Sequence, residues 1–336
     1  MLKGTKLLLA LLATFAVGAA WAQSSPELIA AAQAEGSLEY YANITAIDPV
    51  LEAFAAAYGV DANYTRISTE GFAATLLTEF QAGRQLASVL QAPLPLLEIL
   101  KDFGLLQEYV SPVAADYPEW SKDPDGMIQQ FGIEYVALIY NTELVAAEDV
   151  PTSYMDLTDP KWAGKIVMAN PASHATTIQW LVGLLDHDVF GSEEAWWEFI
   201  NGLAANRPML VASFGPTPGP ISSGEMHIGI SMPKYIVTLA PAPLDWARVS
   251  EPMLGTPRGI ALAAGAPAPN AGKLFIDFWL GQESSEILAN QVGEYVLAPG
   301  VYPPIPGIDG ATVLPLRTMS DEEIAEWGER FGEIFR

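Results

Sequence analysis

Short strand-like runs alternate with helix-like runs along the first third of this chain. The helix-like runs place apolar residues on one stripe, as Phe72, Leu76 and Phe80 do, and several of them stop at a glycine. We expect helices at 26–35, 48–58, 68–82 and 94–103, and strands at 38–43, 60–66 and 87–91. This order predicts an α/β fold with a mostly parallel sheet and helices on its faces.

The alternation is broken once and then resumes. A proline-containing segment at 109–126 ends the first series, and a long apolar strand is expected at 133–140. Strand-like and helix-like runs return from 166 to 230, and a proline-rich stretch precedes a further strand expected at 258–264. We interpret the two isolated strands as crossings between two α/β lobes. A cleft between two such lobes is a common place for a ligand.

Residues 1–22 have the pattern of a secretory signal peptide. Lys3 and Lys6 give the positive start, residues 7–20 are uncharged and mostly apolar, and Ala-Trp-Ala at 20–22 resembles a cleavage site. The apolar run is shorter than the ~20 residues that span a bilayer. The sequence therefore predicts a periplasmic protein, exported and cleaved near Ala22.

Charge and cysteine content exclude several classes of partner and site. The chain has 40 acidic and 16 basic residues, a net charge of −24, and no cysteine. A strongly acidic chain is a poor partner for nucleic acid or for an anionic membrane surface. Without cysteine there are no disulfides, thiolate metal sites or lipid attachment through sulfur.

Motifs of catalysis are missing, which favours a binding protein over an enzyme. The sequence has no G-x-G-x-x-G, no P-loop, no G-x-S-x-G and no H-E-x-x-H pattern, and it has only three histidines. One of them, His174, lies at a strand-to-helix junction with Ser173 and Thr176. The N–H groups of a helix start, with added hydroxyls, can hold an anion. Ser173 could equally cap the helix, and the two roles are compatible.

Several segments resemble the periplasmic solute-binding proteins of ABC importers, in the branch similar to ferric-ion-binding proteins. They are Gly104–Pro112, ALIYNTELV at 137–145, DLTDPKWAGKI at 156–166, Gly255–Pro257 and the run from Ala261 to Leu288. The resemblance implies a two-lobe type II periplasmic-binding-protein fold, in which each lobe is a mixed sheet flanked by helices and the ligand cleft lies between the lobes. The lobes are expected at 23–133 together with 255–290, and at 134–254 together with 291–336.

The resemblance also directs attention to the ligand. Iron-binding members carry two adjacent tyrosines in the second lobe, since phenolate oxygens suit ferric ion. Here the matching positions hold Lys234 and Tyr235, and a lysine ammonium repels a cation. The residues expected at the cleft are mainly neutral hydrogen-bonding groups with one cation: Asn43, Thr45, Gln91, Ser173, His174, Thr176, Lys234 and Tyr235. Such a set suits a small organic anion, a carboxylate or a phosphonate. Lys234 as a solvated helix-start lysine remains an alternative.

The resulting hypothesis is the substrate-binding component of an ABC importer. It would capture a small solute by closure about hinges near 132–139 and 251–258, and deliver it as a monomer to a permease in the inner membrane. No cofactor, resident metal or nucleic-acid partner is expected. Three alternatives stay open: transport of ferric iron with Tyr235 as a ligand, a periplasmic sensor, and an enzyme.

Overall fold

The computed structural model describes residues 24–336, so the predicted signal peptide lies outside the described residues. The strands are β1 (Ser37–Ala42), β2 (Asp61–Arg66), β3 (Val89–Pro93), β4 (Leu106–Gln107), β5 (Ile128–Asn141), β6 (Ile166–Ala169), β7 (Met209–Val211), β8 (Ile228–Ser231), β9 (Leu244–Trp246), β10 (Met253–Ala263), β11 (Tyr295–Val296) and β12 (Val313–Pro315). The α-helices are α1 (Pro26–Glu35), α2 (Asp48–Tyr58), α3 (Thr69–Gln81), α4 (Leu94–Asp102), α5 (Ala175–Asp186), α6 (Glu193–Ala205), α7 (Pro218–Ser222), α8 (Lys234–Thr238), α9 (Pro269–Leu280), α10 (Gln282–Ile287) and α11 (Asp321–Ile334). Shorter turns are the 3₁₀ helices η1 (Pro112–Asp116), η2 (Glu119–Ser121), η3 (Ala147–Asp149), η4 (Tyr154–Thr158), η5 (Pro160–Trp162) and η7 (Ile308–Gly310), and the π-helical turn η6 (Leu288–Val292).

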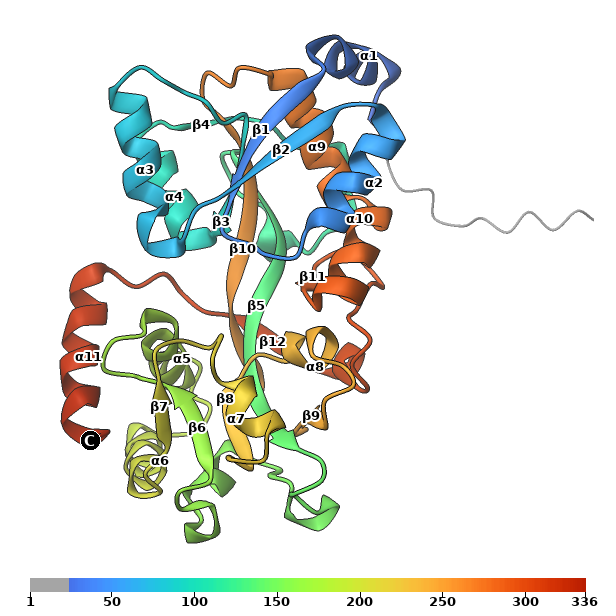
Figure 1. Cartoon of the computed structure of the whole chain (residues 1–336). Coiled ribbons are helices and arrows are strands. Elements are labelled where there is room, and N and C mark those ends of the chain that lie inside the picture. Colours follow the sequence, from blue (N-terminus) through green and yellow to red (C-terminus); the bar gives the residue numbers. More distant parts are fainter. Residues whose placement is uncertain (1–23) are drawn as a thin grey trace, which may run out of the picture.

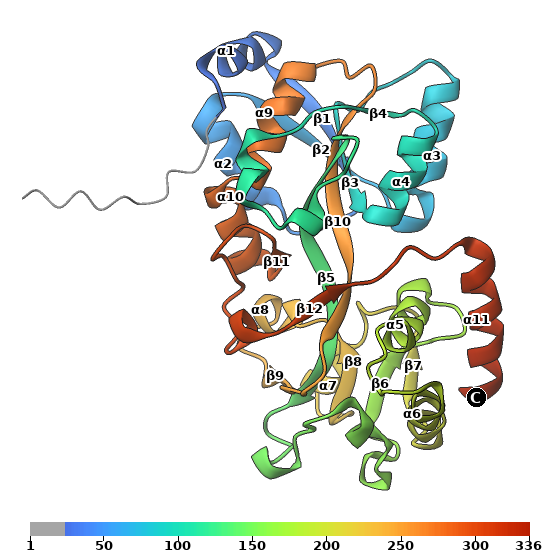
Figure 2. The ribbon, with the colours of Figure 1, turned by 180° about the vertical axis from the view of Figure 1, so that it is seen from behind.

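The elements form two lobes, one above the other in Figure 1, joined by β5 and β10. The first lobe contains β1–β4 with α1–α4, α9 and α10, and the second contains β6–β9 with α5–α8 and α11 (Figures 1 and 2). The strand order is β2-β1-β3-β10-β5-β8-β6-β7, with β2-β1-β3 parallel in the first lobe and β8-β6-β7 parallel in the second. The predicted α/β architecture of two lobes with mixed sheets is confirmed.

The crossing strands differ in length from the prediction. The structure extends the first from the expected 133–140 to Ile128–Asn141, and it begins the second at Met253, inside the proline-rich stretch. Pro257 lies within β10 opposite Ile133. The strand accommodates this proline where its other edge has no ladder partner within the described residues, between the pairings of β10 with β12 at 253–255 and with β3 at 258–262.

A β-bulge bends the two crossing strands between the lobes. Arg258 faces Gly132 and the next residue, Gly259, faces Gln130, so Phe131 is an extra residue on β5. Bulges bend the strand that carries them and increase its local twist. Phe131 packs its ring edge-on against Trp279 of α9, with ring centroids 5.4 Å apart.

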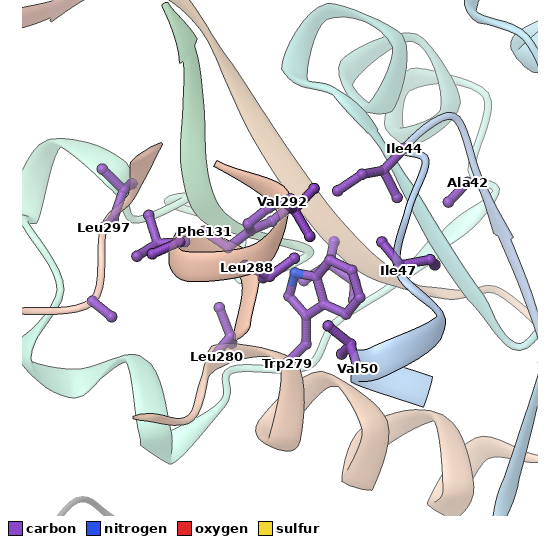
Figure 3. Packing of buried hydrophobic residues seen from close by; sticks show 14 of the residues in the cluster. Ala42, Ile44, Ile47, Val50, Phe131, Trp279, Leu280, Leu288, Val292 and Leu297 are labelled. Carbon is purple, nitrogen blue, oxygen red and sulfur yellow. The ribbon is translucent and has the colours of Figure 1, made fainter. Parts of the chain in front are cut away.

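Buried apolar side chains fill both lobes. In the first lobe Trp279 lies between α2 and the turn η6, in contact range of Val50 and Leu288 (Figure 3). The second lobe is built around Trp180, Trp196 and Phe199, all fully buried. Because the turn η6 shares the core of the first lobe, the segment that follows it, Gly293–Glu294, is held firmly at the junction of the lobes. In the described part of the chain, no helix combines the length and the apolar character that crossing a bilayer requires.

Candidate functional site

The two crossing strands place charged side chains on one face at the junction of the lobes. Thr256 of β10 lies opposite Glu134 of β5 in the antiparallel register. Arg258 is two residues further along β10, so its side chain is on the same face as that of Thr256. Charged residues are almost never fully buried unless they are paired. Their position in the middle of two apolar strands therefore marks this face as the place to look for a site.

Two more charged residues complete what we call the junction cluster, defined as Glu134, Lys234, Arg258 and Glu294. Lys234 Nζ lies 3.1 Å from Glu134 Oε1 and 3.8 Å from Glu294 Oε1. Arg258 Nη1 lies 3.3 Å from Glu294 Oε1 and 4.0 Å from Glu134 Oε1. The cluster thus joins β5, β10, the start of α8 and the segment after η6 in one network.

The two ion pairs of the junction cluster differ in exposure. The side chains of Arg258 and Glu294 are each 2% exposed, whereas those of Lys234 and Glu134 are 22% and 20% exposed. Lys234 and Glu134 are therefore the pair that a molecule entering between the lobes can reach.

The charged forms of Glu134 and Lys234 are favoured by their partners in the junction cluster. Burial opposes ionisation of Glu134, but the nearby Lys234 and Arg258 outweigh it and lower the pKa of that carboxyl. Burial likewise opposes charge on Lys234, but Glu134 and Glu294 outweigh it and raise the pKa of the ammonium. The formal charges of the cluster cancel, because two cations face two carboxylates.

Two residues predicted from the sequence hold the guanidinium of Arg258. Asn43 Oδ1 accepts a hydrogen bond from Arg258 Nη2 at 2.9 Å. With its amide oxygen turned toward the guanidinium, Gln91 accepts from Arg258 Nη2 at 2.9 Å and from Nε at 3.3 Å. Gln91 is fully buried in the middle of the first-lobe strand β3. Both side chains thus contact one guanidinium, a group that the sequence analysis did not foresee.

A small pocket opens beside the junction cluster where the two parts of the sheet separate. One edge of β5 pairs with β11 at Gly132–Ile133 and with β8 at Ala137–Tyr140. Residues 134–136 lie between these two pairings. The pocket is lined by Ile133, Glu134, Tyr135, Met232, Lys234, Gly293, Glu294 and Tyr295. It therefore adjoins the partly exposed ion pair of Lys234 and Glu134.

Three buried hydroxyls near the cluster lack a hydrogen-bond partner within residues 24–336. They are Thr256 Oγ1, the Tyr40 hydroxyl and the Tyr135 hydroxyl, whose residues are 6%, 0% and 3% exposed. Arg258 acts electrostatically on Tyr40. A buried polar atom without a partner is costly unless a bound molecule satisfies it. Thr256 lies on the cluster face and is therefore a candidate ligand contact.

Among the other predicted second-lobe residues, Tyr235 lies beside the cluster. Lys234 Nζ lies 5.9 Å from the centre of the Tyr235 ring. Burial raises the pKa of the Tyr235 phenol, and Lys234 only partly opposes this. His174 Nδ1 is 2.8 Å from Thr177 Oγ1, and its ring packs edge-on against Phe214.

Three of the predicted residues are not seen to join the cluster. Thr45 and Ser173 are exposed, and Thr176 is half-buried on the first turn of α5. The interpretation of Ser173 as the helix cap is wrong, because the N-cap residue is His174, whose side chain makes no capping bond. The alternative of Lys234 as a solvated lysine is also wrong, since Glu134 and Glu294 bind it.

Glu134, Thr256, Arg258 and Glu294 were missed by sequence reasoning. A signal for two of them existed: Glu134 and Arg258 interrupt the apolar runs IEYVALIY and TPRGIALAA. Nothing local distinguishes Glu294 from the many other acidic residues. Within the described residues, no group of three or more histidine or acidic side chains could hold a metal ion.

Comparison with known proteins agrees with this geometry. Residues 94–309 match the family of bacterial extracellular solute-binding proteins. A proposed ABC transporter periplasmic-binding protein of Sinorhizobium fredii is 28% identical over 211 residues, which cover 60% of this chain and 58% of that relative. A proposed 2-aminoethylphosphonate-binding periplasmic protein of Salmonella typhimurium is 25% identical over 240 residues, 69% of this chain and 68% of the relative. The crystal structure of a substrate-binding protein of an ABC transporter from Agrobacterium tumefaciens has a TM-score of 0.72 at 16% identity, covering 89% of this chain and 94% of that one.

Two α/β lobes joined by crossing strands, with a charged site at their junction, define a type II periplasmic binding fold. The chain belongs to the family of bacterial extracellular solute-binding proteins. The resemblance to periplasmic solute-binding proteins that the sequence segments indicated is thereby confirmed.

Proposed function

We propose that this protein captures a small organic anion, a carboxylate or a phosphonate, in the periplasm and delivers it to an ABC permease. The observation that carries the proposal is the junction cluster, which places Lys234 and Arg258 where the two lobes meet. Lysine and arginine form short, charge-assisted hydrogen bonds with carboxylates and phosphonates.

In this proposal Lys234 binds the anion directly, and Arg258 contributes mainly through its positive charge from a buried position. Lys234 is 22% exposed, whereas Arg258 is 2% exposed and is already bound by Asn43 and Glu294. The hydroxyl of Thr256, on the same face as Glu134, would give a further hydrogen bond.

Capture would rely on closure about the crossing strands. The two proposed hinges, 132–139 and 251–258, adjoin the bulge at Phe131 and contain Glu134 and Thr256. A ligand that contacts residues of both lobes binds the closed form better than the open one, and only this difference can drive closure. Asn43 and Gln91 on one side and Lys234 and Tyr235 on the other meet that requirement.

The names of two relatives support the proposal of a periplasmic protein that binds a small anion. One is named as a proposed ABC transporter periplasmic-binding protein, and another as a proposed 2-aminoethylphosphonate-binding protein. We therefore propose a periplasmic location, a membrane permease as partner and no enzymatic role. The alternative of a sensor is decided by which membrane complex binds the ligand-loaded protein, a permease or a signalling receptor.

The test is a binding screen with small carboxylates and phosphonates, by thermal shift and then by calorimetry. We expect saturable binding of at least one such anion to the wild-type protein, and a loss of about tenfold to a hundredfold in affinity in Lys234→Gln. Lys161→Gln is the matched control, because Lys161 pairs with Asp149 at the surface and lies over the Trp162 ring, with no contact to the junction cluster. Equal affinity in wild type and Lys234→Gln would show that the anion binds elsewhere.

A further inference from the structure

We infer that the ligand is a small zwitterion, whose anionic and cationic groups replace the Lys234–Glu134 ion pair. This inference rests on the proposed capture of an organic anion and names the class of anion more narrowly. Three features support it. The charges of the junction cluster balance, only one of its carboxylates is free to change partner, and a pocket lies beside that carboxylate.

The junction cluster is neutral before any ligand arrives. Glu134 and Glu294 balance Lys234 and Arg258 at contact distances between 3.1 and 4.0 Å. An anion that pairs with Lys234 leaves the mostly buried carboxylate of Glu134 without its nearest cation. Leaving one charge of a buried pair uncompensated is strongly unfavourable. A ligand with an ammonium group supplies the missing partner and keeps the site neutral.

The backbone holds Glu294 against the cluster, so Glu134 is the carboxylate that must change partner. Gly293 has φ +76°, and a Cβ atom there would lie 2.9 Å from both the Cα and the carbonyl oxygen of Lys234. This close approach, with the packing of η6 in the first-lobe core, fixes the segment that carries Glu294. Glu294 then stays paired with Arg258, each being 2% exposed.

The position of Glu134 suits an incoming ammonium. It lies on the stretch of β5 between the pairings with β11 and β8, at the wall of the pocket. Opposite it in register is Thr256, whose buried Oγ1 has no hydrogen-bond partner among residues 24–336 and can accept from an ammonium or donate to an anion. Tyr135 and Tyr295, whose ring centroids are 5.2 Å apart, also contribute to the pocket lining.

The experiment compares matched ligand pairs on the wild-type protein by isothermal calorimetry near neutral pH. The pairs are β-alanine with propionate, and 2-aminoethylphosphonate with ethylphosphonate; the members of each pair differ only in the amino group. We expect the amino compound of at least one pair to bind about tenfold or more tightly than its partner. Plain anions that bind as tightly as their amino counterparts would overturn the inference and leave the proposed anion capture standing. If neither member of any pair binds, and the wider panel of anions also fails, both proposals are wrong.

The variant Glu134→Gln tests the role of the carboxylate. We expect it to lose the preference for the amino compound and to bind the plain anion better than the wild type does, because Lys234 is released from its internal partner. Glu148→Gln is the control, since Glu148 is exposed in η3, away from the pocket lining. An unchanged preference in a folded Glu134→Gln protein would also overturn the inference, and the wild-type comparison decides the matter if that variant does not fold.

Discussion

The guanidinium of Arg258 and the carboxylate of Glu294 lie 3.3 Å apart where the two lobes meet, and both side chains are 2% exposed. They come from a crossing strand and from the segment after η6, so their contact ties the strand to the core of the first lobe. A buried pair of this kind is costly to break, although it need not stabilise more than well-packed apolar residues would.

Glu294→Ala is expected to lower the free energy of unfolding by about 3–5 kcal/mol, since it removes the nearer of the two carboxylates that face the buried Arg258. The double variant Arg258→Met with Glu294→Leu should lose much less. Urea unfolding followed by circular dichroism measures both. A single variant as stable as the wild type would show that the guanidinium finds another partner or water.

The pH dependence of stability should depend on Glu134. Its folded pKa is lowered, with Lys234 and Arg258 outweighing burial, so its contribution to stability is present above its ordinary pKa of 4.5 and is lost as pH falls below that value. We expect the urea midpoint of the wild type to fall more between neutral pH and acid than that of Glu134→Gln. Parallel curves for the two proteins would mean that Glu134 does not titrate in this range.

Asp277 is a buried carboxylate that accepts only from neutral donors. The hydroxyls of Tyr109 and Ser111 donate to Oδ1 at 2.7 and 2.6 Å, and Ser24 Oγ donates to Oδ2 at 2.7 Å. Asp277→Ala should cost about 2–4 kcal/mol, because all three donors lose their acceptor and a cavity forms. Ser24→Ala, which removes one donor at the edge of the group, should cost about 1 kcal/mol or less. Guanidinium unfolding distinguishes these values, and a loss for Asp277→Ala no larger than for Ser24→Ala would contradict this account.

Alanine substitutions at Gly293 and Gly300 can distinguish the cost of the backbone angle from the cost of a steric clash. Both have positive φ, +76° and +77°, but a Cβ atom would meet Lys234 at Gly293 and nothing within 4 Å at Gly300. We expect Gly293→Ala to be less stable than Gly300→Ala by about 1–3 kcal/mol and to bind the ligand more weakly, since it pushes Lys234 away. Equal effects in unfolding and binding assays would show that only the backbone angle matters.

Titration with ferric citrate tests the iron alternative. We expect no tyrosinate-to-iron absorption band, because burial raises the pKa of Tyr235 and the Lys234 ammonium lies 5.9 Å from its ring. A band that saturates at one equivalent and disappears in Tyr235→Phe would establish ferric binding and overturn the organic-anion proposal.

The layout of the fold follows from signals that act over a few residues. The alternation of strand-like and helix-like runs predicted the order of strands and helices. At the start of α11, the serine and glutamate at 320 and 323 form a capping box. Two long apolar strands indicated the crossings. The start of β10 was misplaced because its proline suggested a break, while pairing with β5 overrides that local preference.

The site depended on contacts that no short stretch of sequence encodes. Asn43 and Gln91 could be placed at the ends of first-lobe strands, and Lys234 and Tyr235 at a helix start, because position at a strand or helix end is a local property. Their partner Arg258 is 215 residues from Asn43, and Arg258 and Glu294 are 36 residues apart. Sequence periodicity reports which face of an element is buried, but which charges meet there is decided by strand register, by the bulge at Phe131 and by the close approach at Gly293. These arise only when the segments pack together.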